Sequence, residues 1–235
     1  MSLVVSVYVP SGIVMAADSR MSVLRTEDRA EGEEKYRLQQ QLVLSDSASK
    51  VVALTKVAAG ISCYDSGVID NQPVDSHVRR FEEEAITPGD DVLTVADKFL
   101  AYFKERAPNA GIGFHVAGYR IEGKASVPYV LVGHTTREPG VRRVNARDDG
   151  VVQYGIGRAG DVLVANRLID EKNLPLFDAM PLQDAVDYAM HLIRTTIETM
   201  RFEPRYPSVG GPIDVLVVNP DGMQWVQRKH LRGEG

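Results

Sequence analysis

A charged pair near the start of the chain is the first candidate for chemistry. Residues 13–17 read Ile-Val-Met-Ala-Ala, and Asp18 and Arg20 follow, separated only by Ser19. The continuous apolar run predicts a strand buried on both faces, so the pair stands where that strand ends. Such a pair can belong to an active site. Taken alone, it is better explained as a salt-bridged turn where the strand reaches the surface.

A glycine motif later in the chain suggests a different chemistry. Residues 155–160 read Gly-Ile-Gly-Arg-Ala-Gly, which formally matches the fingerprint that places a pyrophosphate at a helix N-terminus. That fingerprint normally lies in a first, parallel βαβ unit. Here it follows strands that we expect to be antiparallel, and Asp178 alone stands where a ribose-binding acid would lie. We therefore interpret the motif as a tight strand-to-helix turn.

Metal and cofactor motifs are missing from the sequence. The five histidines have no zinc-site spacing, and neither a GxSxG elbow nor a P-loop occurs. Cys63 is the only cysteine, which excludes an intrachain disulfide and a cysteine-rich metal site. We expect neither a metal nor any other cofactor.

Charge and hydropathy argue against two classes of partner. The formal net charge of −5 leaves no Lys/Arg excess large enough to meet phosphates, so we expect no nucleic-acid binding. The short basic segment at 227–232 is better explained as a solvated tail. No apolar run approaches the ~20 residues that span a bilayer, and the start does not resemble a secretory signal. We expect a cytoplasmic protein that does not contact a membrane.

The patterning predicts a single domain over residues 1–235 in which strands and helices alternate in groups. Two apolar runs joined by Pro10-Ser11-Gly12 predict a buried hairpin. The charge-rich segment 26–37 predicts an exposed loop, and we expect this loop to shape access to any neighbouring cleft. In chain order we expect strands at 3–9, 13–17, 50–55 and 57–62, helices at 65–85 and 91–105, strands at 114–121, 129–135, 141–145 and 151–154, helices at 160–172 and 182–200, and strands at 213–218 and 223–227.

The connections within each group of strands are too short for crossover helices, so neighbouring strands must run antiparallel. The helix at 91–105 has a continuous apolar stripe that includes Phe99 and Phe103, and Asp90 or Asp91 can cap its first turn. Groups of antiparallel strands flanked by helix pairs predict an α+β fold. Specifically, we expect a four-layer αββα sandwich of two antiparallel sheets between helix pairs.

Four segments, in order, resemble proteasome β-type subunits and their bacterial relatives, which are N-terminal-nucleophile (Ntn) hydrolases. The segments are 12–20 (Gly-Ile-Val-Met-Ala-Ala-Asp-Ser-Arg), 49–52 (Ser-Lys-Val-Val), 57–62 (Val-Ala-Ala-Gly-Ile-Ser) and 210–222, which begins Gly-Gly-Pro-Ile-Asp. The resemblance covers nearly the whole chain, with 26–37 as the one insertion. It implies the αββα fold and homo-oligomers, as rings or stacked dimers, that enclose their active sites.

The resemblance also implies a reaction. In this family a Thr or Ser that begins the chain is the nucleophile, and counting sixteen residues back from Asp18 leads to Ser2. Its own α-amine, with a pKa of ~7.7–8.0, acts as the base. Lys50 would lower the pKa of that amine, Asp18 would hold Lys50, and a backbone N–H near Cys63 would stabilise the oxyanion. The implied substrate is a peptide or a small amide, cleaved through an acyl-enzyme without a cofactor.

Other positions depart from the family pattern. An Asp and a Ser usually precede the Gly-Gly pair, whereas this chain has Tyr206 and Val209 there, and Ser208 could partly substitute. Gly157 stands where the family has the serine of a glycine/serine turn. As supporting residues we therefore name Arg20, Cys63, Gly157 and Ser208.

The start of the chain keeps two functions open. Ser2 has a free amine only if Met1 is removed, and Met1-Ser2-Leu3, like Glu234-Gly235, could derive from an expression vector. The leading function is an N-terminal-nucleophile amidohydrolase. The alternative is a catalytically inactive subunit of the same fold with an assembly or gating role, and a nucleotide-binding protein is a distant third.

Overall fold

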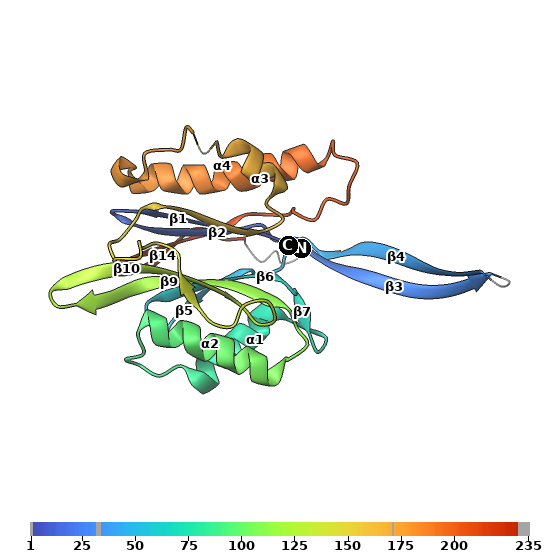
Figure 1. The fold of residues 1–235 in the computed structure, drawn as a ribbon, viewed down its shortest axis with the longest axis horizontal. Helices are drawn as coiled ribbons and strands as arrows, with labels where there is room; N and C mark the ends of the chain where they lie inside the picture. Colours follow the sequence, from blue (N-terminus) through green and yellow to red (C-terminus); the bar gives the residue numbers. More distant parts are fainter. Residues whose placement is uncertain (1, 32–33, 171, 230–235) are drawn as a thin grey trace, which may run out of the picture.

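The computed structural model describes residues 2–31, 34–170 and 172–229. Met1, Glu234 and Gly235 lie outside these residues, as does the part of the basic segment beyond Lys229. Two five-stranded antiparallel sheets face each other, and helices cover the outer face of each (Figure 1). The α+β sandwich of four layers that the sequence predicts is therefore confirmed.

The first sheet joins the two ends of the chain. Its strand order is β12-β1-β2-β13-β14. The two strands of the β1–β2 hairpin are buried along their whole length because α4 packs on one face and the second sheet on the other (Figure 1). The elements of this half are β1 (Leu3–Val9), β2 (Gly12–Ala17), β12 (Gly155–Gly160), α3 (Leu163–Leu168), the 3-10 turn Phe177–Ala179, α4 (Leu182–Met200), β13 (Asp214–Asn219) and β14 (Gly222–Gln227).

The second sheet comes from the middle of the chain, with the order β11-β10-β9-β6-β5. Its elements are β5 (Val51–Leu54), β6 (Ala59–Asp65), β9 (Ile112–Glu122), β10 (Ala125–His134) and β11 (Arg142–Arg143). A small hairpin of β7 (Val68–Ile69) and β8 (Gln72–Pro73) leads into α1 (Val74–Ala85), which is followed by α2 (Val92–Arg106). The Asp91 side chain accepts a hydrogen bond from the Thr94 amide at 2.9 Å, so it caps α2 as expected.

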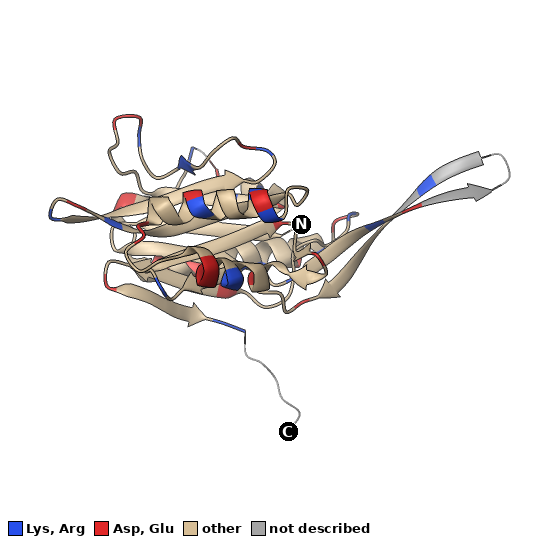
Figure 2. Cartoon of the chain, turned by 90° about the horizontal axis from the view of Figure 1, so that it is seen from below, with Lys and Arg blue, Asp and Glu red and all other residues tan. Residues whose placement is uncertain are grey.

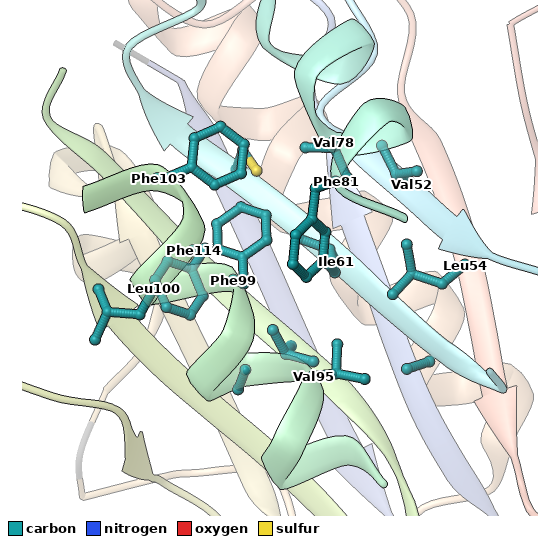
Figure 3. Packing of buried hydrophobic residues seen from close by; sticks show 14 of the residues in the cluster. Val52, Leu54, Ile61, Val78, Phe81, Val95, Phe99, Leu100, Phe103 and Phe114 are labelled. Atoms are coloured by element: carbon teal, nitrogen blue, oxygen red, sulfur yellow. The ribbon is translucent and has the colours of Figure 1, made fainter. Parts of the chain in front are cut away.

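Aromatic side chains fill the space between the second sheet and its helices (Figure 3). Phe99 of α2 lies 5.2 Å from Phe81 of α1, 4.5 Å from Phe103 and 4.7 Å from Phe114 of β9, measured between ring centroids. All four rings are almost completely buried. This interlocked cluster fixes the two helices on the sheet and thereby the start of α1, which lies at the candidate site.

The prediction of a loop at 26–37 was wrong. Strands β3 (Met21–Glu31) and β4 (Glu34–Ser45) pair along their length as an antiparallel hairpin, which we call the arm. It leaves the body of the molecule in both views (Figures 1 and 2). A high density of charge predicts exposure to water, but it does not exclude a strand. Here the two strands satisfy each other's backbone groups although they lack the cover of a core.

The interpretation of residues 155–160 as a turn was also wrong. These residues form β12, which pairs antiparallel with β1 from Leu3↔Gly160 to Tyr8↔Gly155. The buried β1 would otherwise expose an unpaired edge, and β12 supplies its partner.

Helix α3 begins only at Leu163 and is shorter than the helix expected at 160–172. The strand expected at 151–154 reduces to a single bridge between Ala146 and Val152.

A buried histidine lies between the two sheets. His115 of β9 has its Nδ1 2.9 Å from the Ser6 hydroxyl of β1, and only 2% of its surface is exposed. Burial lowers the pKa of His115 to about 4. The imidazole is therefore neutral in the folded protein at neutral pH.

We predict that this histidine makes folding stability depend on pH in a defined window. In the unfolded chain a histidine titrates near ~6.5, so as the pH falls from about 6.5 towards 4 the unfolded state gains a proton that folded His115 resists. Up to about 3 kcal/mol of stability should be present above this window and lost within it. Urea unfolding at pH 7, 5.5 and 4.5 measures the loss. It should shrink in His115→Asn and persist in the exposed-site control His191→Asn, and an equal loss in both variants would contradict the prediction.

We further predict that the arm folds largely independently of the body. Replacing residues 26–39 by Asn-Gly should close a two-residue hairpin between Arg25 and Gln40, which are paired in the arm. Since β3 and β4 pack chiefly against each other, the melting temperature should change by no more than about 4 °C. Thermal unfolding followed by circular dichroism measures this. A drop of more than about 10 °C would mean that the arm packs on the body.

Candidate active site

The centre of the candidate site is the Asp18 carboxylate, directly after β2. The residue is 1% exposed, and the apolar strand before it carries it into the interior. Oδ1 accepts hydrogen bonds from the Leu3 amide at 2.9 Å and from Lys50 Nζ at 2.7 Å. Oδ2 accepts from the amides of Arg20 at 3.1 Å and Gly210 at 2.9 Å. Four donors from four segments therefore converge on one buried carboxylate.

Lys50 approaches Asp18 from the second sheet. It directly precedes β5, and its side chain is only 6% exposed, so its position between the layers follows from where that strand begins. Burial lowers the pKa of Lys50, while the adjacent Asp18 carboxylate opposes this effect, and the cations of Lys229 and Arg20 lower the pKa further. The result is a buried ammonium that releases a proton more readily than a lysine in water.

Ser2 lies beside this ion pair, immediately before β1, and is 6% exposed. Its carbonyl accepts a hydrogen bond from the Asp161 amide at 2.7 Å. Gly160 allows this close approach: its φ is +91°, and a Cβ at that position would lie 1.8 Å from the Ser2 carbonyl oxygen. The next amide, that of Leu3, donates to Asp18, so Ser2 is held from both sides.

Asp161 is a site residue that the sequence reasoning missed. Its Oδ2 accepts hydrogen bonds from Ser208 Oγ and Arg205 Nη1, each at 2.5 Å. Burial alone would raise the pKa of Asp161, but the bonds from Ser208 and Arg205 outweigh it and hold the pKa below its ordinary value. Asp161 Oδ1 is buried without a hydrogen-bond partner among the described residues. Asp161 directly follows β12, the strand that pairs with the start of the chain, and this position could have indicated that it lies near Ser2. Because 155–160 was interpreted as a turn, that position was not recognised.

Arg20 and Ser208, named from the sequence as supporting residues, both lie at this corner. The Arg20 guanidinium pairs with Asp46 through two hydrogen bonds, at 2.7 and 2.9 Å, and donates a third to the Pro207 carbonyl at 3.0 Å. It also packs over Gly210, where a Cβ would lie 2.5 Å from the Arg20 Cζ atom. Arg20 therefore fixes the turn before β13 against the end of β2.

Cys63 and Gly157 lie differently from what was expected. The Cys63 amide already donates to the Lys50 carbonyl at 2.8 Å, so this N–H is committed to the sheet rather than directed towards an oxyanion. Burial, with a smaller contribution from Asp75, raises the pKa of the Cys63 thiol to about 12, which makes it a poor nucleophile. Gly157 is paired with Ser6 inside the first sheet. A Cβ at Gly157 would lie 3.7 Å from His115 Cε1, so this position faces His115 and not Ser2.

Lys229 adds a second cation that the sequence reasoning assigned to a solvated tail. Its side chain is half-buried, with Nζ 3.1 Å from Ser19 Oγ and in an ion pair with Asp214. Asp214 is the first residue of β13 and pairs in register with Ala17, next to Asp18. Lys229 therefore closes the corner from the C-terminal side.

A small pocket opens beside Ser2. Its walls come from the base of the arm, the segment before β5, the end of β6 and the start of α1, and its volume is about 20 Å³. Its lining includes Ser2, Arg20, Met21, Lys50, Asp65 and Asp75. This space is sufficient for a water-sized group, such as the ammonium at the end of a side chain.

The remaining sequence motifs bring no second site together. No three His, Cys, Asp or Glu side chains meet as a metal site within residues 2–31, 34–170 and 172–229. The glycine motif is a paired strand, whereas a pyrophosphate site needs a loop at a helix N-terminus. Within the same described ranges, no helix is long and apolar enough to cross a membrane.

Comparison with known proteins identifies the fold. No protein-family model matches the chain, and no curated protein matches it. Among solved structures it resembles the Anbu (Gly-1) mutant from Hyphomicrobium sp. strain MC1, with a TM-score of 0.63 and 16% sequence identity. The match covers 97% of this chain and 86% of that chain. The chain has the proteasome-like Ntn-hydrolase fold.

The contact between Gly160 and Ser2 gives a testable prediction with a matched control. Gly160 and Gly123 both have positive φ, at +91° and +63°, but nothing lies within 4 Å of a Cβ at Gly123. Gly123→Ala should cost about 1 kcal/mol through backbone strain alone. Gly160→Ala should cost about 3 kcal/mol or more beyond that, because the new methyl displaces Ser2. Urea unfolding measures both, and equal midpoints would contradict the prediction.

Proposed function

We propose that this chain is an N-terminal-nucleophile amidohydrolase, a peptidase whose nucleophile is Ser2. One observation carries the proposal: Asp18 Oδ1 accepts both the Lys50 ammonium and the amide of the residue that follows Ser2. This arrangement brings a hydroxyl, a lysine of lowered pKa and a buried carboxylate to one corner. These are the groups that activation of a serine by a neighbouring base requires.

The reaction follows from these groups. The Ser2 α-amine, freed by removal of Met1, takes the hydroxyl proton while Oγ forms a bond to the substrate carbonyl carbon. The carbon–nitrogen bond then breaks, and the departing amine takes the proton from the α-ammonium. A water molecule attacks the resulting ester in the same way, which releases the acid and restores Ser2. The positive charge of Lys50 keeps the α-amine neutral and ready to accept the proton at neutral pH.

Asp161 supports this mechanism from the opposite side of Ser2. Its amide holds the Ser2 carbonyl, and its buried Oδ1 has acceptor capacity that no described residue uses. A carboxylate in this place can accept a hydrogen bond from an α-ammonium as it forms. Asp161 and Ser208 can therefore position the N-terminus at Ser2, which Tyr206 and Val209 cannot do.

A second candidate function is a non-catalytic subunit of the same fold with an assembly or gating role. The substitution of Tyr206 and Val209 for the usual polar pair favours it. The intact Ser2, Asp18 and Lys50 corner favours the enzyme. The two functions make opposite predictions about covalent labelling of Ser2.

We further propose that the protein is cytoplasmic and forms homo-oligomers, as rings or stacked dimers. The likeness in fold supports assembly, and so do exposed aliphatic side chains at the base of the arm, such as Leu24 at 60% and Leu44 at 51% exposure. Light scattering coupled to gel filtration tests this, and a monomeric mass at micromolar concentration would contradict it.

We predict that protein beginning at Ser2 reacts once with a peptide epoxyketone, which bonds both the hydroxyl and the free α-amine of an N-terminal nucleophile. Intact-mass spectrometry should show one added probe per chain, and peptide mapping should locate it on Ser2. The same chain with Met1 retained, and Ser2→Ala, should remain unlabelled. Lys50→Met should slow labelling by about 100-fold or more, because the α-amine then loses its adjacent positive charge.

The decisive control is the state of the chain start. Mass spectrometry must first establish that Met1 is absent. A retained Met1 leaves Ser2 without a free α-amine, so the protein would stay unlabelled whether or not it is an enzyme. An unlabelled protein with a confirmed free Ser2 would overturn the enzyme proposal in favour of the non-catalytic subunit.

A further inference from the structure

We propose that the pocket beside Ser2 selects a substrate side chain that ends in a positive charge, of the lysine type, and that Asp75 sets this preference. The inference rests on the proposed function, because it treats the pocket as the place where a substrate side chain enters. Asp75 is the second residue of α1 and lines the pocket together with Ser2.

The charges around the pocket leave one carboxylate uncompensated. Four charged side chains line it, and three have partners of opposite charge. Arg20 pairs with Asp46 at 2.7 Å, and Lys50 pairs with Asp18 at 2.7 Å. Asp65 pairs with Arg137 at 2.9 Å and lies 3.1 Å from His134 Nε2. Asp75 forms no ion pair or hydrogen bond with any residue in the part of the chain that the structure describes.

The Asp75 carboxylate acts on the interior of the pocket. It contributes to the raised pKa of the buried Cys63 thiol, which also lines the pocket, so its field reaches the inner wall. Asp75 is half-buried, and at such a place an opposite charge interacts more strongly than on an open surface. A cationic group in the pocket would supply the missing partner.

The walls around Asp75 suit an aliphatic stem. The lining includes four apolar residues: Met21 at the base of the arm, Cys63 of β6, and Pro73 and Val74 at the start of α1. A chain of methylenes that ends in an ammonium would place carbon against these residues and its charge beside Asp75.

One wall is held rigidly in an unusual conformation. Asp65 has a φ of +71°, in the left-handed region that favours glycine. The hydrogen bond of 3.1 Å from the Ser66 amide to the Gly111 carbonyl fixes the turn, and Arg137 fixes the side chain. Asp65 therefore shapes the wall with its charge already balanced, which leaves Asp75 as the group that discriminates between substrates.

The test compares epoxyketone probes that differ only in the side chain next to the reactive group: lysine, its uncharged analogue norleucine, arginine and glutamate. The rate of mass gain at Ser2 is measured for the wild-type enzyme and for Asp75→Asn. We expect lysine to react about tenfold faster than norleucine, and glutamate to react slowest. In Asp75→Asn the lysine-to-norleucine ratio should fall towards one.

Asp184→Asn is the matched control. Asp184 is also an acid in the first turn of a helix, α4, but it is exposed and does not line the pocket. Asp75→Asn and Asp184→Asn remove similar interactions with a helix dipole, so a general effect on stability would appear in both. Only Asp75→Asn should change the lysine-to-norleucine ratio. A wild-type ratio near one, or a ratio unchanged in Asp75→Asn, would overturn the inference while leaving the proposed function intact.

If no probe reacts, the proposed function fails, and the pocket is tested by binding alone. Ligand-observed NMR then compares Nα-acetyl-lysine methylamide with Nα-acetyl-norleucine methylamide. Binding of the lysine compound that weakens in Asp75→Asn and at high salt supports the inference. Equal binding of the two compounds, or binding of neither, overturns it.

Discussion

One buried carboxylate determines how the parts of this molecule meet. Removing a charge from water is costly unless hydrogen bonds and opposite charge replace the solvent. Asp18 meets this requirement with donors from the start of β1, from its own turn, from Lys50 and from Gly210. The first sheet, the second sheet and the turn before β13 are therefore joined at a single point. The geometry of the candidate site and the closure of the sandwich depend on the same bonds.

Further acid–base pairs surround that point and keep the corner close to neutral. Lys229 pairs with Asp214, Arg20 with Asp46, and Arg205 with Asp161. The first two pairs each close the base of a hairpin, and the third joins the end of β12 to the segment before β13, so each restricts how these segments can move. A candidate nucleophile at the start of a chain needs such restriction, because chain ends are ordinarily the most mobile part of a fold.

The sequence predicted the elements whose signal is local. The apolar hairpin of β1 and β2, the stripe of α2 with its Asp91 cap, and the paired layers all follow from periodicity and turn residues. Two features depended on distant partners and were missed. The residues of β12 form a strand because they pair with the edge of β1, and nothing in the sequence of 155–160 itself indicates that partner. Asp161 gains its position from Ser2 and Ser208, which are remote in the chain. The arm was missed because charge reports exposure and not backbone conformation.

The order of strands in the first sheet also bears on how the protein is made. The second sheet and its helices come from one continuous stretch between Val51 and Arg143, so this half can fold as soon as that stretch leaves the ribosome. The hairpin of β1 and β2 is synthesised first, yet its partners β12 and β13 begin only at Gly155 and Asp214. Two largely apolar strands therefore stay uncovered until those partners are made, which is a period of risk for aggregation. The corner around Ser2 closes only after Gly210 has been made and reaches Asp18.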